Sequence, residues 1–172
     1  MRKLIAILVM LVLASVLYGS NEGKRIVIKG VTTGFTTESN RKLHDVTIRV
    51  YKFNKLITTF YSNSKGKFEF EIPKNSYITL VFEKDNFVSK RILFDTRSDN
   101  SDIQSIKPFD LKVMLIENIE GIDYEDLDFP ITKIMFNEKM NDYSYAKKYT
   151  ELMLKKQEEI LLLIEQKILA AR

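Results

Sequence analysis

Hydrophobic and polar positions alternate with a period of two from residue 24 to about residue 94. Val46, Ile48 and Val50, for example, are separated by single polar residues. This alternation is typical of half-buried antiparallel strands, which place one face on a core and the other in water. Turn residues, mainly Asn, Gly and Pro, separate the alternating runs. They predict six strands, at residues 25–32, 45–53, 55–62, 67–72, 76–83 and 87–94.

A seventh alternating run follows a polar connection, with Phe109, Leu111, Val113 and Leu115 on one face. Several short strands at such close spacing imply two packed sheets or a barrel. We therefore expect a mainly β fold, a seven-stranded Greek-key β-sandwich over residues 24–116.

The last third of the chain changes its pattern. Residues 117–141 begin with an acidic loop and continue into a possible short strand at residues 131–136. From residue 142 the apolar positions recur at three, four or seven residues, as in Ile160 and Ile164. This period predicts one long C-terminal helix at residues 142–172.

The helix is apolar on more than one face, because residues 160–164 are all Ile or Leu. A helix that only covers a sheet needs a single apolar stripe. One hypothesis is that this helix packs over the open sheet face. The other is that it binds an envelope protein partner, a second copy of the chain or a membrane surface. The candidate partner-binding residues are Leu152, Met153, Ile160, Leu161 and Ile164.

One turn in the first part of the chain carries a specific prediction. Gly66 stands where a polar loop enters a strand, a position at which a positive φ or a bulge is common. After it, Phe68, Phe70 and Ile72 should face the core, and the glutamates between them should face solvent.

Taken together, these motifs resemble the carboxypeptidase regulatory-like domain, a prealbumin-like (transthyretin-like) β-sandwich, over residues 24–96. The resemblance rests on Gly30-Val31 at the end of the first strand, on residues 46–51, and on the hairpin that contains Gly66. The glycine usual before the family's corner aromatic is Asn86 here, and asparagine also tolerates the left-handed region. The resemblance implies a non-catalytic spacer, folding aid or docking module, as found in Gram-negative outer-membrane and surface systems.

The N-terminus predicts export. Two basic residues, Arg2 and Lys3, precede an uncharged run from residue 4 to residue 18, and a Gly-Ser-Asn exit follows. This arrangement is typical of a signal peptide at residues 1–19, and the run is shorter than most membrane spans. An uncleaved anchor is the alternative. We expect a periplasmic or cell-surface protein of a Gram-negative bacterium, with no membrane span after cleavage.

Composition excludes several classes of function. The chain has no cysteine, so it forms no disulfide and carries no lipid-modified N-terminal cysteine. Its net charge of +4 is small and the basic residues are scattered, which argues against a nucleic-acid binder.

Candidate chemistry is sparse, and we expect no enzyme, no catalytic residue and no cofactor. His44 is the single histidine, and a lone histidine without cysteine supplies at most one member of a zinc or hydrolytic site. The acidic loop at residues 117–128 lacks the calcium-loop spacing, and whether it binds calcium stays open.

The sequence thus favours an exported accessory module of the cell envelope. The alternative is a protein that binds a small ligand or carbohydrate through Tyr61, Tyr77 and Phe87, which requires these rings to form one concave cluster.

Overall fold

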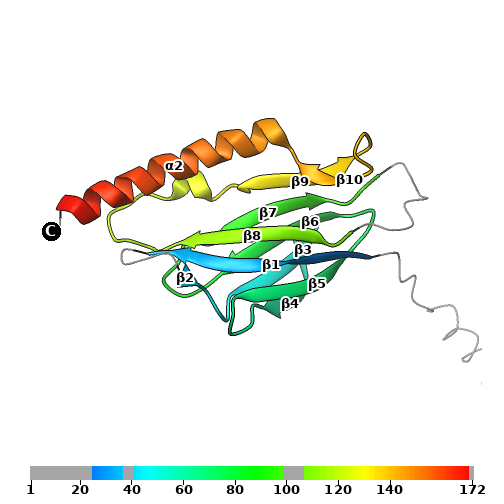
Figure 1. Cartoon of the computed structure of the whole chain (residues 1–172), viewed down its shortest axis with the longest axis horizontal. Helices are drawn as coiled ribbons and strands as arrows, with labels where there is room; N and C mark the ends of the chain where they lie inside the picture. Colours follow the sequence, from blue (N-terminus) through cyan, green and yellow to red (C-terminus); the bar gives the residue numbers. More distant parts are fainter. Residues whose placement is uncertain (1–24, 37–40, 99–106, 171–172) are drawn as a thin grey trace, which may run out of the picture.

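The computed structural model describes residues 25–36, 41–98 and 107–170. These residues form two packed β-sheets and a C-terminal helix (Figure 1), so the predicted mainly β class is confirmed. Ten strands are found among the described residues, so the count differs from the predicted seven: β9 corresponds to the short strand expected at residues 131–136, and β2 and β10 were not predicted. The strands are β1 (Arg25–Phe35), β2 (Arg41–Lys42), β3 (Thr47–Lys52), β4 (Lys55–Tyr61), β5 (Lys67–Pro73), β6 (Tyr77–Glu83), β7 (Lys90–Asp95), β8 (Phe109–Ile116), β9 (Thr132–Asn137) and β10 (Asp142–Tyr145).

The two sheets differ in size and in how their strands pair. In the four-stranded sheet, β1 pairs with β5 and β2 antiparallel and with β8 parallel. The six-stranded sheet has the order β10-β9-β7-β6-β3-β4, and β7 and β9 are its parallel pair. Strands β8 and β9 are therefore close in sequence but belong to different sheets.

The core lies between the two sheets and follows the alternation of the sequence. In β5, Phe68, Phe70 and Ile72 are buried while the residues between them are exposed, as predicted. Phe68 packs against Phe82 of the opposite sheet with ring centroids 5.6 Å apart. Burial of such side chains contributes roughly 1.5–3 kcal/mol each.

The predicted turns are present, and asparagine supplies four of the eight left-handed positions among the described residues. Asn54, Asn75 and Asn86 have φ values of 62°, 51° and 66°. Gly66 has φ 71°, as predicted for the loop that leads into β5. The short polar side chain of asparagine makes this region less costly than it is for most residues.

Gly66 also lies at a junction of three chain segments. Its carbonyl oxygen accepts hydrogen bonds from Thr32 N at 2.8 Å and from Thr32 Oγ1 at 3.1 Å. The fully buried Thr32 hydroxyl also contacts the Leu43 carbonyl oxygen at 2.6 Å. A side chain at position 66 would enter this junction.

The predicted start of the helix at residue 142 is wrong. The helix α2 spans Lys147–Ala170, and residues 142–145 form β10 instead. Tyr143 explains the difference, because its ring is buried against Phe94 and Phe136 with centroid distances of 5.2 and 5.5 Å. A strand presents this ring to the core, since it alternates with the residues on either side.

The predicted separation of residues 117–141 from the sandwich also needs correction. The hairpin of β9 and β10 extends the six-stranded sheet beyond β7, so the sandwich continues to Tyr145. Within the preceding acidic loop, the 3-10 helix η1 (Glu125–Leu127) contacts α2.

The proposed signal segment at residues 1–19 lies outside the described residues. Among the helices that the structure does describe, none is long and apolar enough to cross a bilayer.

Replacing Gly66 with alanine should destabilise the fold. The added Cβ would lie 2.8 Å from the Thr32 carbonyl oxygen and 2.9 Å from that of Leu43, on a backbone with positive φ. We expect a loss of roughly 2–4 kcal/mol in the free energy of unfolding, measured by urea titration.

The matched control is Gly121→Ala, at a φ of 74°, where the new Cβ would meet only the movable end of Lys167 at 2.6 Å. It should lose less stability than Gly66→Ala. Equal losses would show that backbone conformation alone, and not the crowded junction, determines the effect.

Candidate functional site

A cleft separates α2 from the open side of the sandwich. It has a volume of about 390 Å³ and is bounded by β7, the edge of β8, the β9 and β10 hairpin and the first half of α2. Its apolar lining residues are Ile92, Leu111, Met114, Ile131 and Leu154. Its polar lining residues are Lys90, Lys112, Thr132, Tyr145, Thr150 and Gln157.

Lys90 is the buried cation of this cleft. The alternation of β7 places it on the inward face with Ile92 and Phe94, and only 8% of its surface is exposed. Its Nζ donates to the Met114 carbonyl oxygen on β8 and to Gln157 Oε1 on α2, the latter at 2.8 Å. Lys90 therefore bridges both sheets and the helix.

The charge of Lys90 has no carboxylate counterpart within the described part of the chain. All the ion pairs found there involve other residues, and both hydrogen-bond acceptors of its Nζ are neutral oxygens. Burial lowers the pKa of Lys90 to about 8, because it penalises the charged form.

The start of α2 is fastened to the six-stranded sheet beside this cleft. The Thr132 and Thr150 hydroxyls are hydrogen-bonded to each other at 2.6 Å. Tyr149 donates its hydroxyl proton to the Pro130 carbonyl oxygen, also at 2.6 Å. These bonds hold the helix at a set distance from β9, which keeps the cleft open on one side.

The second half of α2 covers a separate hydrophobic cluster. Ile160 and Ile164 are buried there with Ile116 at the end of β8 and Leu127 of η1. Leu161 is partly buried at the margin of the same cluster. This half of the helix closes the sandwich by packing over the acidic loop.

The structure therefore divides the five predicted partner-binding residues. Met153, Ile160 and Ile164 are buried inside the protein and cannot contact a partner with α2 in this position, so their assignment was wrong. Leu161 is half-buried, and only Leu152 is freely exposed. The exposed apolar side chains of α2 are Leu152, Leu154, Leu162, Leu163 and Leu169.

The acidic loop pairs with nearby cations. Asp126 forms an ion pair with Lys156 of α2, and Asp128 lies 3.5 Å from Arg91 of β7. Among the residues that the structure describes, no three His, Cys, Asp or Glu side chains gather as metal ligands would.

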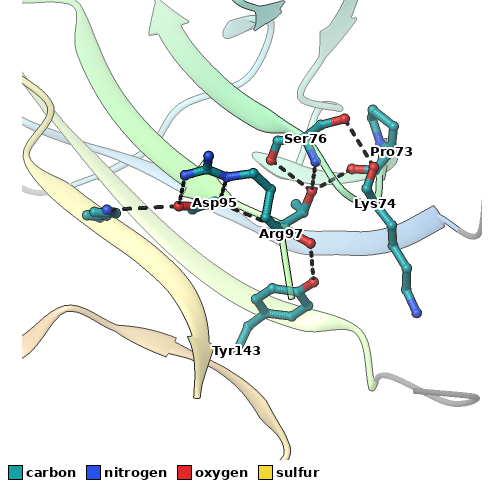
Figure 2. A network of polar contacts seen from close by, with 8 residues as sticks. Pro73, Lys74, Ser76, Asp95, Arg97 and Tyr143 are labelled. Carbon is teal, nitrogen blue, oxygen red and sulfur yellow. Dashed lines mark hydrogen bonds and ion pairs between the residues drawn. The ribbon is translucent and has the colours of Figure 1, made fainter. Parts of the chain in front are cut away.

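A polar network occupies the opposite end of the sandwich (Figure 2). Arg97 donates two hydrogen bonds of 2.8 Å to Asp95, and Lys133 lies 3.9 Å from the same carboxylate. The Arg97 hydrogen bond holds the pKa of Asp95 below its usual range, against the opposing effect of burial. Unlike Lys90, Asp95 thus has its counter-charges beside it.

The same network fastens the connection between β5 and β6, which passes from one sheet to the other. Thr96 Oγ1 bonds the Pro73 and Ser76 carbonyl oxygens, each at 2.9 Å, and Tyr143 donates to the Thr96 carbonyl oxygen at 3.2 Å. These contacts join the ends of β5, β6, β7 and β10, so the network has a structural role.

The remaining candidates from the sequence do not converge. His44 is exposed, and its Nδ1 lies 2.5 Å from Asp45. Tyr61 is exposed on β4, whereas Tyr77 lies at the far end of β6, where Arg97 stands over its ring at 5.3 Å. Phe87 packs partly buried against the core. The three aromatic rings form no single cluster, which removes the basis of the carbohydrate alternative.

Lys90 is the residue that the sequence interpretation missed. The basic residues are scattered along the sequence, but the alternation of β7 places Lys90 in line with Ile92. That alternation was the available signal, and it points a lysine toward the inside of the sandwich.

No protein-family model matches this chain, and no curated protein matches it. Among solved structures, it is similar to 3-chlorocatechol 1,2-dioxygenase from Rhodococcus opacus 1CP (12% identity, TM-score 0.38, 57% of this chain and 62% of that chain). It is also similar to the Bacillus anthracis TIE protein (14% identity, TM-score 0.38, 54% and 18%) and to chlorocatechol 1,2-dioxygenase from Pseudomonas putida (10% identity, TM-score 0.39, 58% and 62%). The chain spans less than two thirds of each of these proteins, and similarity at this level carries no argument about activity.

The buried Lys90 should make stability depend on pH. Its pKa is about 8 when folded and 10.5 when unfolded, so the unfolded chain binds more protons between these values. The free energy of unfolding should therefore rise by roughly 1–2 kcal/mol between about pH 7.5 and pH 9.5, measured by urea titration.

The rise in stability should end near pH 10. Burial raises the pKa of Tyr143 to about 12 and also raises that of Tyr145, so above about pH 10 the unfolded chain binds fewer protons and stability falls. Lys90→Met should abolish the rise. Lys112→Met, which removes an exposed lysine at the same cleft, should retain it. A rise that persists in Lys90→Met would assign the effect to another group.

Proposed function

We propose that the chain is an exported, non-catalytic accessory module of the Gram-negative cell envelope that assembles with a second copy of itself through α2. The observation that carries this proposal is a row of leucines on the outer face of the helix. Leu152, Leu162, Leu163 and Leu169 are exposed by 55%, 56%, 51% and 69%. The side chains that anchor α2 lie on its other face, so the leucines have no part in holding the helix in place.

The spacing of these leucines suits a helical partner. Leu162 and Leu169 are seven residues apart, and Leu152 and Leu163 are eleven apart, so each pair lies along nearly the same line of the helix. Contiguous exposed apolar surface of this kind commonly marks an interaction site.

The charges of α2 favour a second copy as the partner. The first half of the helix, residues 147–158, carries four lysines and two glutamates, and the second half, residues 159–170, carries two glutamates and one lysine. In an antiparallel pair, the lysine-rich half of one copy lies against the glutamate-rich half of the other. Such a pair has two-fold symmetry, which is the commonest arrangement of homodimers.

The resemblance to the carboxypeptidase regulatory-like domain supports the non-catalytic part of the proposal. Three of its motif positions have structural roles here: Gly30 lies against the β8 backbone, Gly66 forms the β5 turn and Asn86 adopts the left-handed corner. Membership of that family and its Greek-key strand order remain part of the proposal, together with export through residues 1–19.

Self-association can be tested by sedimentation velocity on the chain from residue 20 onward. We expect a concentration-dependent dimer, and Leu162→Glu with Leu163→Glu should make it monomeric without loss of stability, because both side chains already face solvent. Leu56→Glu, an equally exposed leucine on β4, should leave the dimer intact. Substitution of Ile164 would be uninformative, since its burial makes it part of the core.

A charge-swap experiment tests the antiparallel arrangement. One variant carries Lys148→Glu and Lys155→Glu, and the other carries Glu159→Lys and Glu165→Lys. Each should be monomeric alone, and mixing the two should restore a dimer by pairing opposite charges. Failure of the mixture to dimerise would exclude the proposed pairing. A wild-type chain that stays monomeric at all concentrations would exclude self-association altogether.

A further inference from the structure

The cleft between α2 and the sandwich combines an apolar wall with one buried cation. Lys90 lines it from β7, and Met114 of β8, Ile131 before β9 and Leu154 of α2 supply accessible apolar surface. A volume of about 390 Å³ lies within the range of small-molecule sites. Few polar groups in a mostly apolar cleft are also characteristic of such sites.

The hydrogen bonds of Lys90 leave its charge uncompensated. An ammonium group has three donors, and two of them are used by the Met114 carbonyl oxygen and Gln157 Oε1. Both acceptors are neutral, and a buried charge is costly unless an opposite charge lies beside it. A ligand that brings a negative charge to the cleft would supply both the third acceptor and the counter-charge.

The neighbouring groups favour a single negative charge over a phosphate. The Thr132 and Thr150 hydroxyls are engaged with each other, and Gln157 presents its oxygen to Lys90. The other donors of the lining, Lys112 and Tyr145, are exposed to solvent, so the buried part of the site offers few donors to the several oxygens of a phosphate or sulfate group. A carboxylate, which has two oxygens, fits one ammonium better.

We propose that this cleft binds a small monocarboxylate with an apolar chain. The carboxylate pairs with the Lys90 ammonium, and the chain lies against Met114, Ile131 and Leu154. This site is independent of self-association, because Leu162 and Leu163 point away from the cleft. Monomeric variants of the outer leucines therefore retain it.

The proposal can be tested by isothermal titration calorimetry, which measures the affinity of octanoate for the chain from residue 20 onward. We expect octanoate to bind, and 1-octanol and octylammonium to bind at least tenfold more weakly, because they lack the negative charge. Lys90→Met should weaken octanoate binding at least tenfold, whereas Lys112→Met, at the exposed margin of the same cleft, should change it less than twofold. Circular dichroism checks that both variants fold.

A second pair of variants locates the ligand even if Lys90→Met does not fold. Leu154→Trp places a bulky ring in the cleft and should abolish binding, and Leu152→Trp, on the outer side of α2, should preserve it. Absence of octanoate binding to the unmodified chain would overturn the proposal. So would equal binding of 1-octanol, an equal loss in Lys112→Met, or retained binding in Leu154→Trp.

Discussion

The open side of the sandwich, between β8 of one sheet and β7 of the other, has to be covered without a pairing strand. Strand β8 pairs with β1 alone among the described strands, so the carbonyl groups along its outer edge need other partners. Lys90 reaches across from β7 and donates to the Met114 carbonyl oxygen, and Gln157 of α2 accepts from the same ammonium group. This bridge adds to the hydrogen bonds of Thr150 and Tyr149 and the packing of Ile160 and Ile164 that hold the helix, and it leaves a cleft beneath the first half of α2.

The charged side chains of Asp95 and Lys90 are both buried, but their surroundings differ. Asp95 has Arg97 and Lys133 beside it, and a lowered pKa is the expected result of such pairing. Lys90 has only neutral oxygens beside it, and burial lowers its pKa toward the neutral form. The partners of a paired charge offset the cost of its desolvation, whereas a buried cation without a counter-charge is complementary to an anion. The cleft that Lys90 lines is for this reason the place with a binding function to propose.

The functional residues were harder to find from the sequence than the strands. The apolar residues of the helix were correctly recognised, but their division into buried and exposed faces depends on where the helix meets the acidic loop. Ile160 and Ile164 face inward because η1 and the end of β8 lie beneath them. Lys90 was overlooked because a lysine in a strand is exposed in most proteins, and its burial depends on α2 lying over it.

The sequence by itself determined the backbone state of most of the chain. Alternation predicted the strands, since a strand turns successive side chains to opposite faces, and asparagine and glycine predicted the left-handed turns. These are local properties, which neighbouring residues decide. The tertiary structure alone decided that β8 pairs with β1 in parallel, that Tyr143 draws residues 142–145 into a strand, and that Lys90 lies under the helix. Each of these depends on contacts between segments that are distant in sequence. A local pattern of residues does not show the free energy of such contacts.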